Sequence, residues 1–541
     1  MKNFKILITD HLAEEGYRIL NADSEVDYEL RAGIKNSELK PILKDYDAII
    51  TRSGTTVDKD LLSDTGKLRI IGRAGVGLDN VDIEEASKRG IIVMNAPTGN
   101  TLAAVELTLG LILSAARKIP SADFHVRNDG WDRKRFLGVQ LYGKALGIVG
   151  LGRIGRNVAV RANSFGMRVF AYDPYIKAET AESMGVTLFK TLDELLAHSD
   201  IVTLHTPLTA ETKNLITREK IAIMKDGAIF INCARGGLVE ESALAEALKS
   251  GKLFSAATDV YEEEPPIHSA LKSIDNLFLT PHIGANTEEG QKGVAVIVCE
   301  QVLNALHGRA YQFAVNTPFE RNRLSPDMQR FFDVSERLGR LAGQLTNGRV
   351  QELRLIMAGK RFNDSFVEHA FDSPFNYQPF TFAAIKGFLE FFVHEAVSFI
   401  NAPYFAKDRG IVVTETKVQE YNKMSDHVIL TVKTDEEETV YTATVFSDGV
   451  GRIVGVGPFR LDLIPSGMYL YFRNVDTPGI VGYVGTLLGK HNINIANFEL
   501  TRLSPNGEAI SFVYVDEPIT QAVLDEMSGY PGIIEVKFLK V

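Results

Sequence analysis

A glycine-rich stretch at residues 146–155 constrains the fold of this chain more than any other feature. Residues 145–149 are apolar and predict a buried strand, and Gly150, Gly152 and Gly155 then form G-x-G-x-x-G where that strand should turn into a helix. We expect Gly150 to allow the turn, Gly152 to admit a close ligand, and Gly155 to let the helix touch the strand. Because N–H groups and the dipole at a helix start favour an anion, the pattern predicts a site for a dinucleotide pyrophosphate.

An acidic residue in the expected place identifies which dinucleotide fits. A second strand is predicted at residues 168–172, and Asp173 ends it eighteen residues after Gly155. A carboxylate there accepts hydrogen bonds from the adenosine ribose hydroxyls and repels the 2′-phosphate of NADP. The sequence therefore favours NAD as the cofactor.

Composition excludes several other classes of protein. The chain has 541 residues and a net charge of -10, which argues against nucleic acid as a partner because phosphate binding needs a basic surface. Cys233 and Cys299 are the two cysteines, so we expect neither a disulfide framework nor a metal cluster. The strand pattern at 5–9 begins without a signal-peptide pattern, and no apolar run is long enough for a membrane span. We expect a cytoplasmic protein.

The order of predicted elements indicates four domains. Residues 5–97 alternate short apolar strands with amphipathic helices, and a second such series starts at residue 147, after a long apolar helix at 102–116. We therefore predict an α/β fold with two doubly wound parallel sheets, one in a substrate-binding domain (1–97 and 286–316) and one in a Rossmann NAD-binding domain (98–285). An α+β intervening domain should span 317–460, with helices at 328–345 and 383–399. The order βαββαβ over 467–541 predicts a ferredoxin-like domain.

Three side chains with redox chemistry follow predicted strand ends in the second series, where α/β folds place ligands: Arg235, Glu264 and His282. A histidine can take the proton of a hydroxyl group as hydride leaves, and a glutamate can fix the tautomer of that histidine. An arginine can hold a carboxylate with two hydrogen bonds. Structural alternatives remain, because His282 can cap a turn, Glu264 can lie in a solvated acidic loop, and Arg235 can bind a helix end.

Four motifs together resemble the D-2-hydroxyacid dehydrogenase family. They are KALGIVGLGRIG at 144–155, NCARGG at 232–237, DVYEEEP at 259–265 and TPHIGA at 280–285. The resemblance covers residues 1 to about 315 and implies that Arg235, Glu264 and His282 are the catalytic triad. It also implies that NAD is bound by a set of glycines, strand-end residues and loop residues: Val76, Gly150, Gly152, Arg153, Ile154, Gly155, Asp173, Thr206, Cys233, Ala234, Asp259, Gly284 and Ala285.

The N-terminal motifs resemble the branch of this family that oxidises D-3-phosphoglycerate. They are RAGVGLDNVD at 73–82, NAPTGN at 95–100 and GWDRKRF at 130–136. The resemblance implies that Arg52 and Arg73 hold a phosphate, while the backbone of Gly75, Val76 and Gly77 holds a carboxylate. The basic residues at 133–135 would add charge, from a neighbouring subunit. For Arg52 and Arg73 the structural alternative is surface salt bridging.

The C-terminal segment resembles an ACT domain, a ferredoxin-like module that binds amino acids in metabolic enzymes. DTPG at 476–479 and NINI at 492–495 match the pattern of that module. The resemblance implies an L-serine effector held by Asn474, Asp476 and Asn494, although the first position is often histidine or tyrosine in relatives. An ACT domain that only packs against another copy is the alternative.

Together these resemblances imply NAD-dependent oxidation of a small phosphorylated 2-hydroxy acid, D-3-phosphoglycerate, as the first step of phosphorylated L-serine synthesis. One alternative is a dehydrogenase for another acid, such as a 2-oxoglutarate reductase, and another is a non-catalytic NAD-sensing scaffold. We expect a homo-oligomer, a dimer or a tetramer, with the helix at 102–116 at a seam between cofactor domains.

Overall fold

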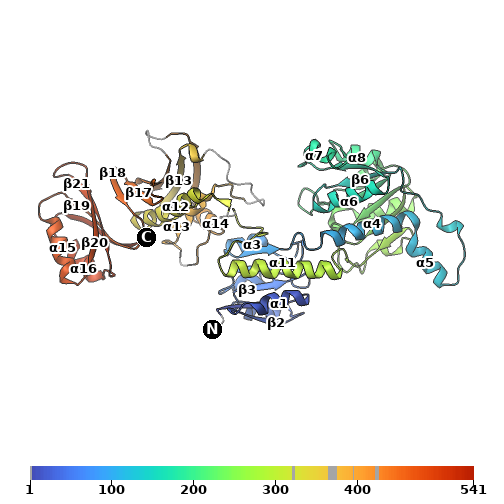
Figure 1. The fold of residues 1–541 in the computed structure, drawn as a ribbon, viewed down its shortest axis with the longest axis horizontal. Coiled ribbons are helices and arrows are strands. Elements are labelled where there is room, and N and C mark those ends of the chain that lie inside the picture. The colour runs from blue at the N-terminus through green and yellow to red at the C-terminus, as the bar shows by residue number, and fades with distance from the viewer. Residues whose placement is uncertain (1–2, 320–322, 363–373, 394, 421–425) are drawn as a thin grey trace.

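The structure is a computed structural model, and it describes residues 3–319, 323–362, 374–393, 395–420 and 426–541. Four sheets organise these residues, with five, seven, six and four strands in chain order. Figure 1 shows the first sheet in the middle of the molecule, the second on one side, and the third and fourth on the other. Among the described residues, no helix combines the length and the apolar character needed to cross a membrane.

The first unit is a parallel sheet with the strand order β2-β1-β3-β4-β5, which is the flavodoxin-like doubly wound order. Its strands are β1 (Phe4–Ile8), β2 (Val26–Leu30), β3 (Ala48–Thr51), β4 (Ile70–Arg73) and β5 (Ile92–Asn95). The helices between them are α1 (Glu14–Ala22), α2 (Asn36–Leu43) and α3 (Ile83–Lys88).

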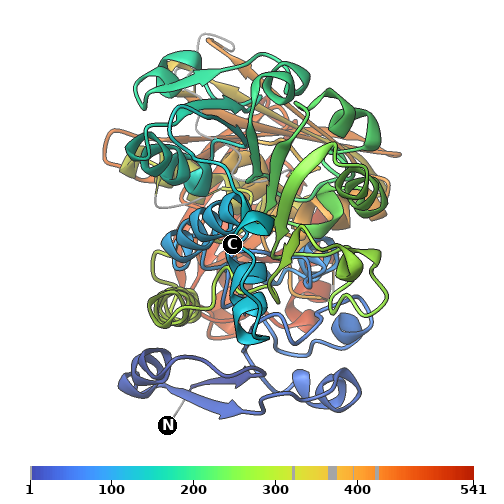
Figure 2. The same cartoon turned by 90° about the vertical axis from the view of Figure 1, so that its right-hand side faces the viewer.

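The second unit is a parallel sheet with the order β12-β11-β10-β9-β6-β7-β8, in which the order reverses between β6 and β9 as in a Rossmann fold. Its strands are β6 (Ala145–Val149), β7 (Arg168–Tyr172), β8 (Val186–Leu188), β9 (Ile201–Leu204), β10 (Ala228–Asn232), β11 (Leu253–Thr258) and β12 (Leu277–Leu279). Its helices are α4 (Thr101–Arg117), α5 (Ile119–Arg127), α6 (Arg153–Ser164), α7 (Ala178–Glu182), α8 (Leu192–His198), α9 (Arg218–Ile223) and α10 (Glu241–Lys249). Figure 2 shows this unit facing the viewer.

The chain passes between these two units twice. Helix α4 leads from β5 into the second unit, and α11 (Glu288–Leu306) returns from β12 to the first. Val298 and Val302 of α11 are fully buried in the same cluster as Ile6 and Ile50 of the first sheet. The two passages therefore lie side by side at the junction of the units, where a hinge between them would act.

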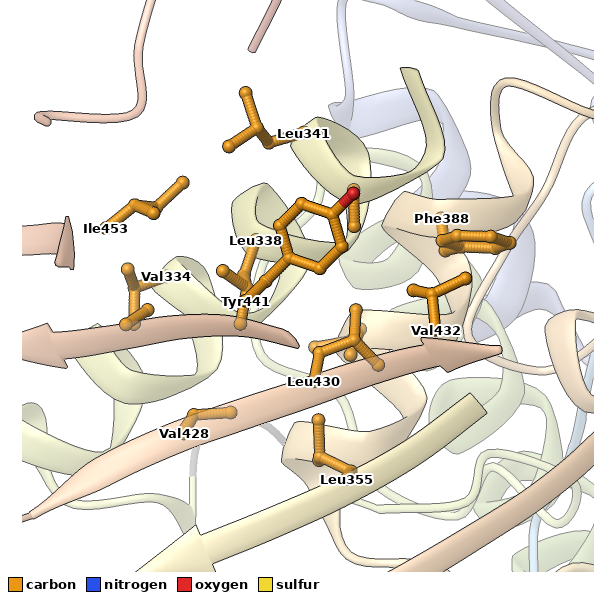
Figure 3. Packing of buried hydrophobic residues seen from close by; sticks show 14 of the residues in the cluster. Val334, Leu338, Leu341, Leu355, Phe388, Val428, Leu430, Val432, Tyr441 and Ile453 are labelled. Atoms are coloured by element: carbon orange, nitrogen blue, oxygen red, sulfur yellow. The ribbon is translucent and has the colours of Figure 1, made fainter. Parts of the chain in front are cut away.

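The third unit is a mixed sheet covered by two long helices. Its strands are β13 (Val350–Ala358), β14 (Val412–Val418), β15 (His427–Thr434), β16 (Glu438–Val445), β17 (Gly451–Val456) and β18 (Phe459–Leu463), and its helices are α12 (Pro326–Leu345), α13 (Pro379–Leu389) and α14 (Ala402–Asp408). Tyr441 of β16 is buried between the sheet and residues of both long helices, including Leu338 and Phe388 (Figure 3). Gly339 and Gly387 let these helices approach closely, since an added Cβ would lie 2.0 Å and 1.9 Å from carbonyl oxygens of the opposite helix.

The fourth unit has the ferredoxin-like order β20-β21-β19-β22, with all pairs antiparallel. Its elements are β19 (Met468–Val475), α15 (Ile480–Lys490), β20 (Ile495–Arg502), β21 (Glu508–Val515), α16 (Gln521–Ser528) and β22 (Ile533–Lys540). One face of the sheet, with Leu470 and Phe472, packs under α15 and α16. The opposite face, with Tyr471 and Phe512, belongs to the core of the third unit, so this chain covers both faces.

The predicted fold class is confirmed, and three expected details differ. Strand β2 carries the alternating sequence VDYEL and β8 has only three residues, so neither stood out as a strand. The helix predicted at 383–399 ends at Leu389. Beyond it, Phe392 is exposed and contacts the nearby Phe388 and Phe391 rings, while Phe399 packs on Phe332 of α12.

Candidate functional site

The ends of three neighbouring strands bring together the three predicted side chains. Arg235 follows β10, Glu264 follows β11 and His282 follows β12. Nδ1 of His282 lies 2.7 Å from Oε2 of Glu264, which is hydrogen-bond distance. Sequence separation hides this pair, but parallel strands place their carboxyl ends at one edge of the sheet.

Asp259 fixes the loop that carries His282. Its Oδ1 accepts hydrogen bonds from Oγ1 of Thr280 at 2.6 Å and from the N–H of Ile283 at 2.8 Å, and its Oδ2 accepts one from the N–H of Gly284 at 2.8 Å. His282 itself has φ of 52°, a left-handed conformation that costs energy in a residue other than glycine. Three bonds to one buried carboxylate hold this strained residue in place.

The electrostatics of the pair favour a proton on His282 and an ionised Glu264. The hydrogen bond to Glu264 raises the pKa of His282 above its ordinary value, against the opposing effect of burial. For Glu264, burial alone would raise the pKa, but the hydrogen bond and charge of His282, together with the N–H of Tyr261 and the charge of Arg235, lower it overall. An imidazole with this partner accepts a proton readily and keeps its tautomer, as general acid–base chemistry requires.

The three glycines of the G-x-G-x-x-G turn have distinct roles. Gly150 has φ of 93°, and a Cβ there would lie 2.7 Å from the carbonyl oxygen of His205. A Cβ on Gly155 would lie 2.1 Å from the carbonyl oxygen of Gly150, so this glycine permits the contact between α6 and the turn. Around Gly152, by contrast, no atom lies within 4 Å of the Cβ position. The space above Gly152, at the start of α6, fits the pyrophosphate of a dinucleotide.

Polar atoms near the turn also fit NAD. Asp173 accepts hydrogen bonds from the N–H groups of Leu151 at 2.8 Å and Tyr175 at 2.9 Å, which hold its carboxylate beside the turn with lone pairs to spare for ribose hydroxyls. Oγ1 of Thr206 is buried and has no hydrogen-bond partner among the described residues. A buried hydroxyl is rarely left unpaired, so Thr206 is suited to a polar ligand.

A cleft of about 920 Å³ lies between the first and second units. Its lining combines backbone and side chains of both units with the predicted histidine–glutamate pair. The predicted site residues that line it are Arg52, Arg73, Gly75, Val76, Gly77, Ile154, Cys233, Arg235, Asp259, Glu264, His282, Gly284 and Ala285. The predicted residues outside this lining are Gly150, Gly152, Arg153, Gly155, Asp173, Thr206 and Ala234.

Positive charge gathers at the first-unit side of the cleft. Arg73 is largely buried, and burial together with the charge of Arg235 lowers its pKa to about 10. Its Nε has no hydrogen-bond partner within the described part of the chain. Gly75 makes room for this side chain, because a Cβ there would lie 1.4 Å from Nη1 of Arg73. A buried guanidinium group with an unpaired Nε beside a second cationic side chain fits an anionic ligand.

Two further residues of the cleft were not singled out from the sequence. Asp79 forms an ion pair with Arg235, with Oδ2 of Asp79 lying 3.0 Å from Nε of Arg235. Asn100, at the start of α4, has a buried Oδ1 without a partner in the described residues. Asp79 belongs to the motif at 73–82 and Asn100 to the motif at 95–100. Their side chains line the cleft only because the two units face each other.

In the fourth unit, the three residues expected at an effector site have different surroundings. Asn474 is buried, and its Oδ1 has no partner among the residues described. Asp476 accepts a hydrogen bond from Arg502 at 2.6 Å, and Nδ2 of Asn494 donates to Asp516 at 2.6 Å. Asn474 is thus the one of the three with an unused buried acceptor.

Family models match two parts of the chain. Residues 109–284 match the D-isomer specific 2-hydroxyacid dehydrogenase, NAD binding domain. Residues 327–457 match the D-3-phosphoglycerate dehydrogenase intervening domain. The first match covers the G-x-G-x-x-G turn and the three strand ends, and the second covers most of the third unit.

Whole-chain relatives agree with these models. A D-3-phosphoglycerate dehydrogenase of Methanocaldococcus jannaschii is 40% identical over 99% of this chain and 100% of its own length. One from Bacillus subtilis is 37% identical over 99% of both chains. Among solved structures, a glyoxylate reductase from Paecilomyes thermophila is 31% identical with a TM-score of 0.54 and covers 58% of this chain and 99% of its own. A D-lactate dehydrogenase of Aquifex aeolicus, complexed with NAD and lactic acid, is 29% identical with a TM-score of 0.50 and covers 56% and 96%.

Proposed function

The chain belongs to the D-3-phosphoglycerate dehydrogenase family, and from this premise we propose how its cleft oxidises D-3-phosphoglycerate to 3-phosphohydroxypyruvate. It is an NAD-dependent 2-hydroxyacid dehydrogenase, and this reaction is the first step of phosphorylated L-serine synthesis. The single observation that carries the mechanism is the 2.7 Å bond between His282 and Glu264, in a cleft that also contains Arg235 and Arg73.

The side chains of the cleft have separate roles in the oxidation of the alcohol. When bound, NAD supplies the acceptor for the C2 hydride. The neutral His282 takes the proton of the 2-hydroxyl group, and Glu264 stabilises the imidazolium that forms. Arg235 binds the carboxylate and polarises the developing carbonyl. In the reverse direction, the protonated His282 returns the proton to the carbonyl oxygen.

The cofactor site combines the turn after β6 with loops at the strand ends. Arg153 and Ile154 offer N–H groups at the start of α6 to the pyrophosphate, with Gly150, Gly152 and Gly155 shaping the turn. Asp173 would hold the adenosine ribose. The remaining contacts, toward the nicotinamide half, come from loops on the cleft side: Val76, Thr206, Cys233, Ala234, Asp259, Gly284 and Ala285.

The substrate site uses the positive side of the cleft. Arg73, with its buried and unpaired Nε, and Arg52 are placed in this proposal at the phosphate. The backbone of Gly75, Val76 and Gly77 and the guanidinium of Arg235 would hold the carboxylate. In this assignment, residues 1–97 with 286–316 form the substrate-binding domain and 98–285 the NAD-binding domain, with residues 317–460 intervening and 467–541 forming the ACT domain.

Substitution of His282 by Asn tests the mechanism. The variant removes the proton acceptor, so we expect kcat to fall by about 10²- to 10⁴-fold while the Kd for NADH, measured by fluorescence titration, stays unchanged. A variant that keeps most of its turnover would contradict the role of His282. If the unmodified protein binds NADH but turns over no 2-hydroxy or 2-keto acid, the NAD-sensing scaffold is the better account.

The segment after α4, residues 119–137, has exposed apolar side chains that support a homo-oligomer. Helix α5 has no buried residue, and the side chains of Phe124, Trp131 and Leu137 are 69%, 81% and 79% exposed. Several exposed apolar side chains in one short segment are typical of a subunit interface, so a second copy would cover them and bring the basic residues 133–135 near its cleft. Sedimentation of the Phe124→Glu variant should give a smaller assembly than that of the unmodified protein, and an unchanged mass would contradict this seam.

The fourth unit is the place for an L-serine effector. The buried, unpaired Oδ1 of Asn474 supports this proposal, with Asp476 and Asn494 as the other contacts. L-serine should slow NADH oxidation in the unmodified protein, and Asn494→Ala should weaken that inhibition without changing the rate in its absence. If L-serine inhibits the Asn494→Ala variant as strongly as the unmodified protein, an ACT domain that only packs against another copy is the better account.

A further inference from the structure

Arg235 is held by two hydrogen bonds of different origin. Its Nη1 donates to the carbonyl oxygen of the adjacent Ala234 at 2.7 Å, a bond within the second unit. Its Nε donates to Oδ2 of Asp79 at 3.0 Å, and Asp79 lies in the loop after β4 of the first unit. The second bond therefore crosses the cleft and joins residues that are 156 positions apart in the sequence.

These two bonds leave one end of the guanidinium group for a ligand. Neither bond uses Nη2, and Arg235 and Asp79 both line the cleft. Gly77 makes the arrangement possible, since a Cβ there would lie 2.1 Å from Nη2 and 2.8 Å from Oδ2 of Asp79. Asp79 thus binds the guanidinium group at Nε, while Nη2 lies beside Gly77.

Asp79 also balances charge at a crowded cationic site. The charges of Arg235 and Arg52 both repel that of Arg73, while Asp79 is a counter-charge to Arg73 as well as to Arg235. Asp10, the other carboxylate nearby, accepts hydrogen bonds from the N–H of Arg52 and the hydroxyl of Thr51. Asp79 is therefore the carboxylate that contacts the Arg235 side chain from the opposite unit.

We propose that Asp79 is a positioning residue that couples closure of the two units to the orientation of Arg235. When the first and second units approach, Asp79 binds Nε and sets Nη2 toward the carboxylate and carbonyl of the 2-keto acid; when they separate, Arg235 loses this restraint. The inference rests on the proposed function and deepens it, because it names what orients the substrate-binding arginine.

Removing the carboxylate tests the inference. With 3-phosphohydroxypyruvate and NADH, Asp79→Ala should lower kcat/KM by about 10- to 100-fold, because a small misplacement of a substrate-holding group is costly. The Kd for NADH and the melting temperature should stay unchanged. Asp60→Ala is a matched control, since Asp60 is an exposed carboxylate of the same unit that pairs with Lys40 outside the cleft. The control should keep the kcat/KM of the unmodified protein.

A double-mutant cycle separates positioning from a general structural role. Arg235→Lys has no Nε for Asp79 to hold, so Asp79→Ala should cost much less in that background than in the unmodified protein. Equal fold-losses in both backgrounds, or an Asp79→Ala variant with unchanged kcat/KM, would overturn the inference. Absence of turnover in the unmodified protein would instead overturn the proposed function, so the two failures are distinguishable.

Discussion

Two glycine-rich loops each follow a parallel strand, and they use the missing side chain in opposite ways. At Gly152, in the turn after β6, the Cβ position has no atom within 4 Å. At Gly75 and Gly77, in the loop after β4, the Cβ positions lie 1.4 Å from Nη1 of Arg73 and 2.1 Å from Nη2 of Arg235. The first loop leaves room for a ligand, and the second is already filled by arginine side chains of the protein.

The difference shows that a glycine pattern does not by itself locate a ligand. Both loops follow the carboxyl end of a parallel strand, where α/β folds bind ligands. In the loop after β6 the backbone can approach an anion directly. In the loop after β4 the glycines let guanidinium groups approach the backbone, and we propose that those groups bind the anionic substrate.

Of the substitutions in the two loops, Gly77→Ala should have the larger effect on catalysis. The new Cβ would push Nη2 of Arg235 aside, and we expect kcat/KM to fall by about 10²-fold or more because the substrate carboxylate loses its aligned partner. The affinity for NADH should not change, since the other loop is untouched. Steady-state kinetics and an NADH titration check both expectations. An unchanged kcat/KM in Gly77→Ala would contradict the proposed difference between the two loops.

Gly152→Ala should show the converse behaviour with a smaller effect. The methyl group meets open space in the protein, so the melting temperature should hold, but it would stand where the pyrophosphate approaches. We expect the Kd for NADH to rise by roughly tenfold, which corresponds to about 1.4 kcal/mol. Gly482→Ala, at an equally open glycine in α15, is the control and should leave NADH binding unchanged. An unaltered Kd in Gly152→Ala would argue that the space is not a cofactor site.

The pH dependence of keto-acid reduction tests the role of His282 and of its hydrogen bond to Glu264. Reduction needs the protonated His282, and the bond to Glu264 raises its pKa above the ordinary 6.5, so the rate should persist above that pH and fall as pH rises through the raised pKa. In Glu264→Gln this support is lost, and the falling limb of kcat/KM should move to lower pH. A limb that stays in place would mean that Glu264 does not set the pKa of His282.

Much of the site could be predicted from local sequence, because the residues around a strand determine where it ends. The turn at 150–155 and the positions of Arg235, Glu264 and His282 needed only the alternation of apolar strands and helices. The ion pair between Asp79 and Arg235 could not be predicted in this way, since it depends on how two separately folded units face each other.

The expected fold was least accurate where packing decides the structure. The apolar run beyond Leu389 has the composition of a helix, but Phe391 and Phe392 are exposed there and Phe399 packs on Phe332 of α12. Strand β8 has only three residues and pairs with β7 at the edge of the second sheet, so its sequence carries little signal of its own.

The most direct test of the account is the ratio of kcat/KM for 3-phosphohydroxypyruvate to that for hydroxypyruvate, with 2-oxoglutarate as a third substrate, measured by NADH oxidation. We predict a strong preference for the phosphorylated acid in the unmodified protein, and loss of most of that preference in Arg73→Met, which removes the buried guanidinium. Equal kcat/KM values for the three acids, or an undiminished preference in Arg73→Met, would contradict a phosphate site at the arginine-filled loop.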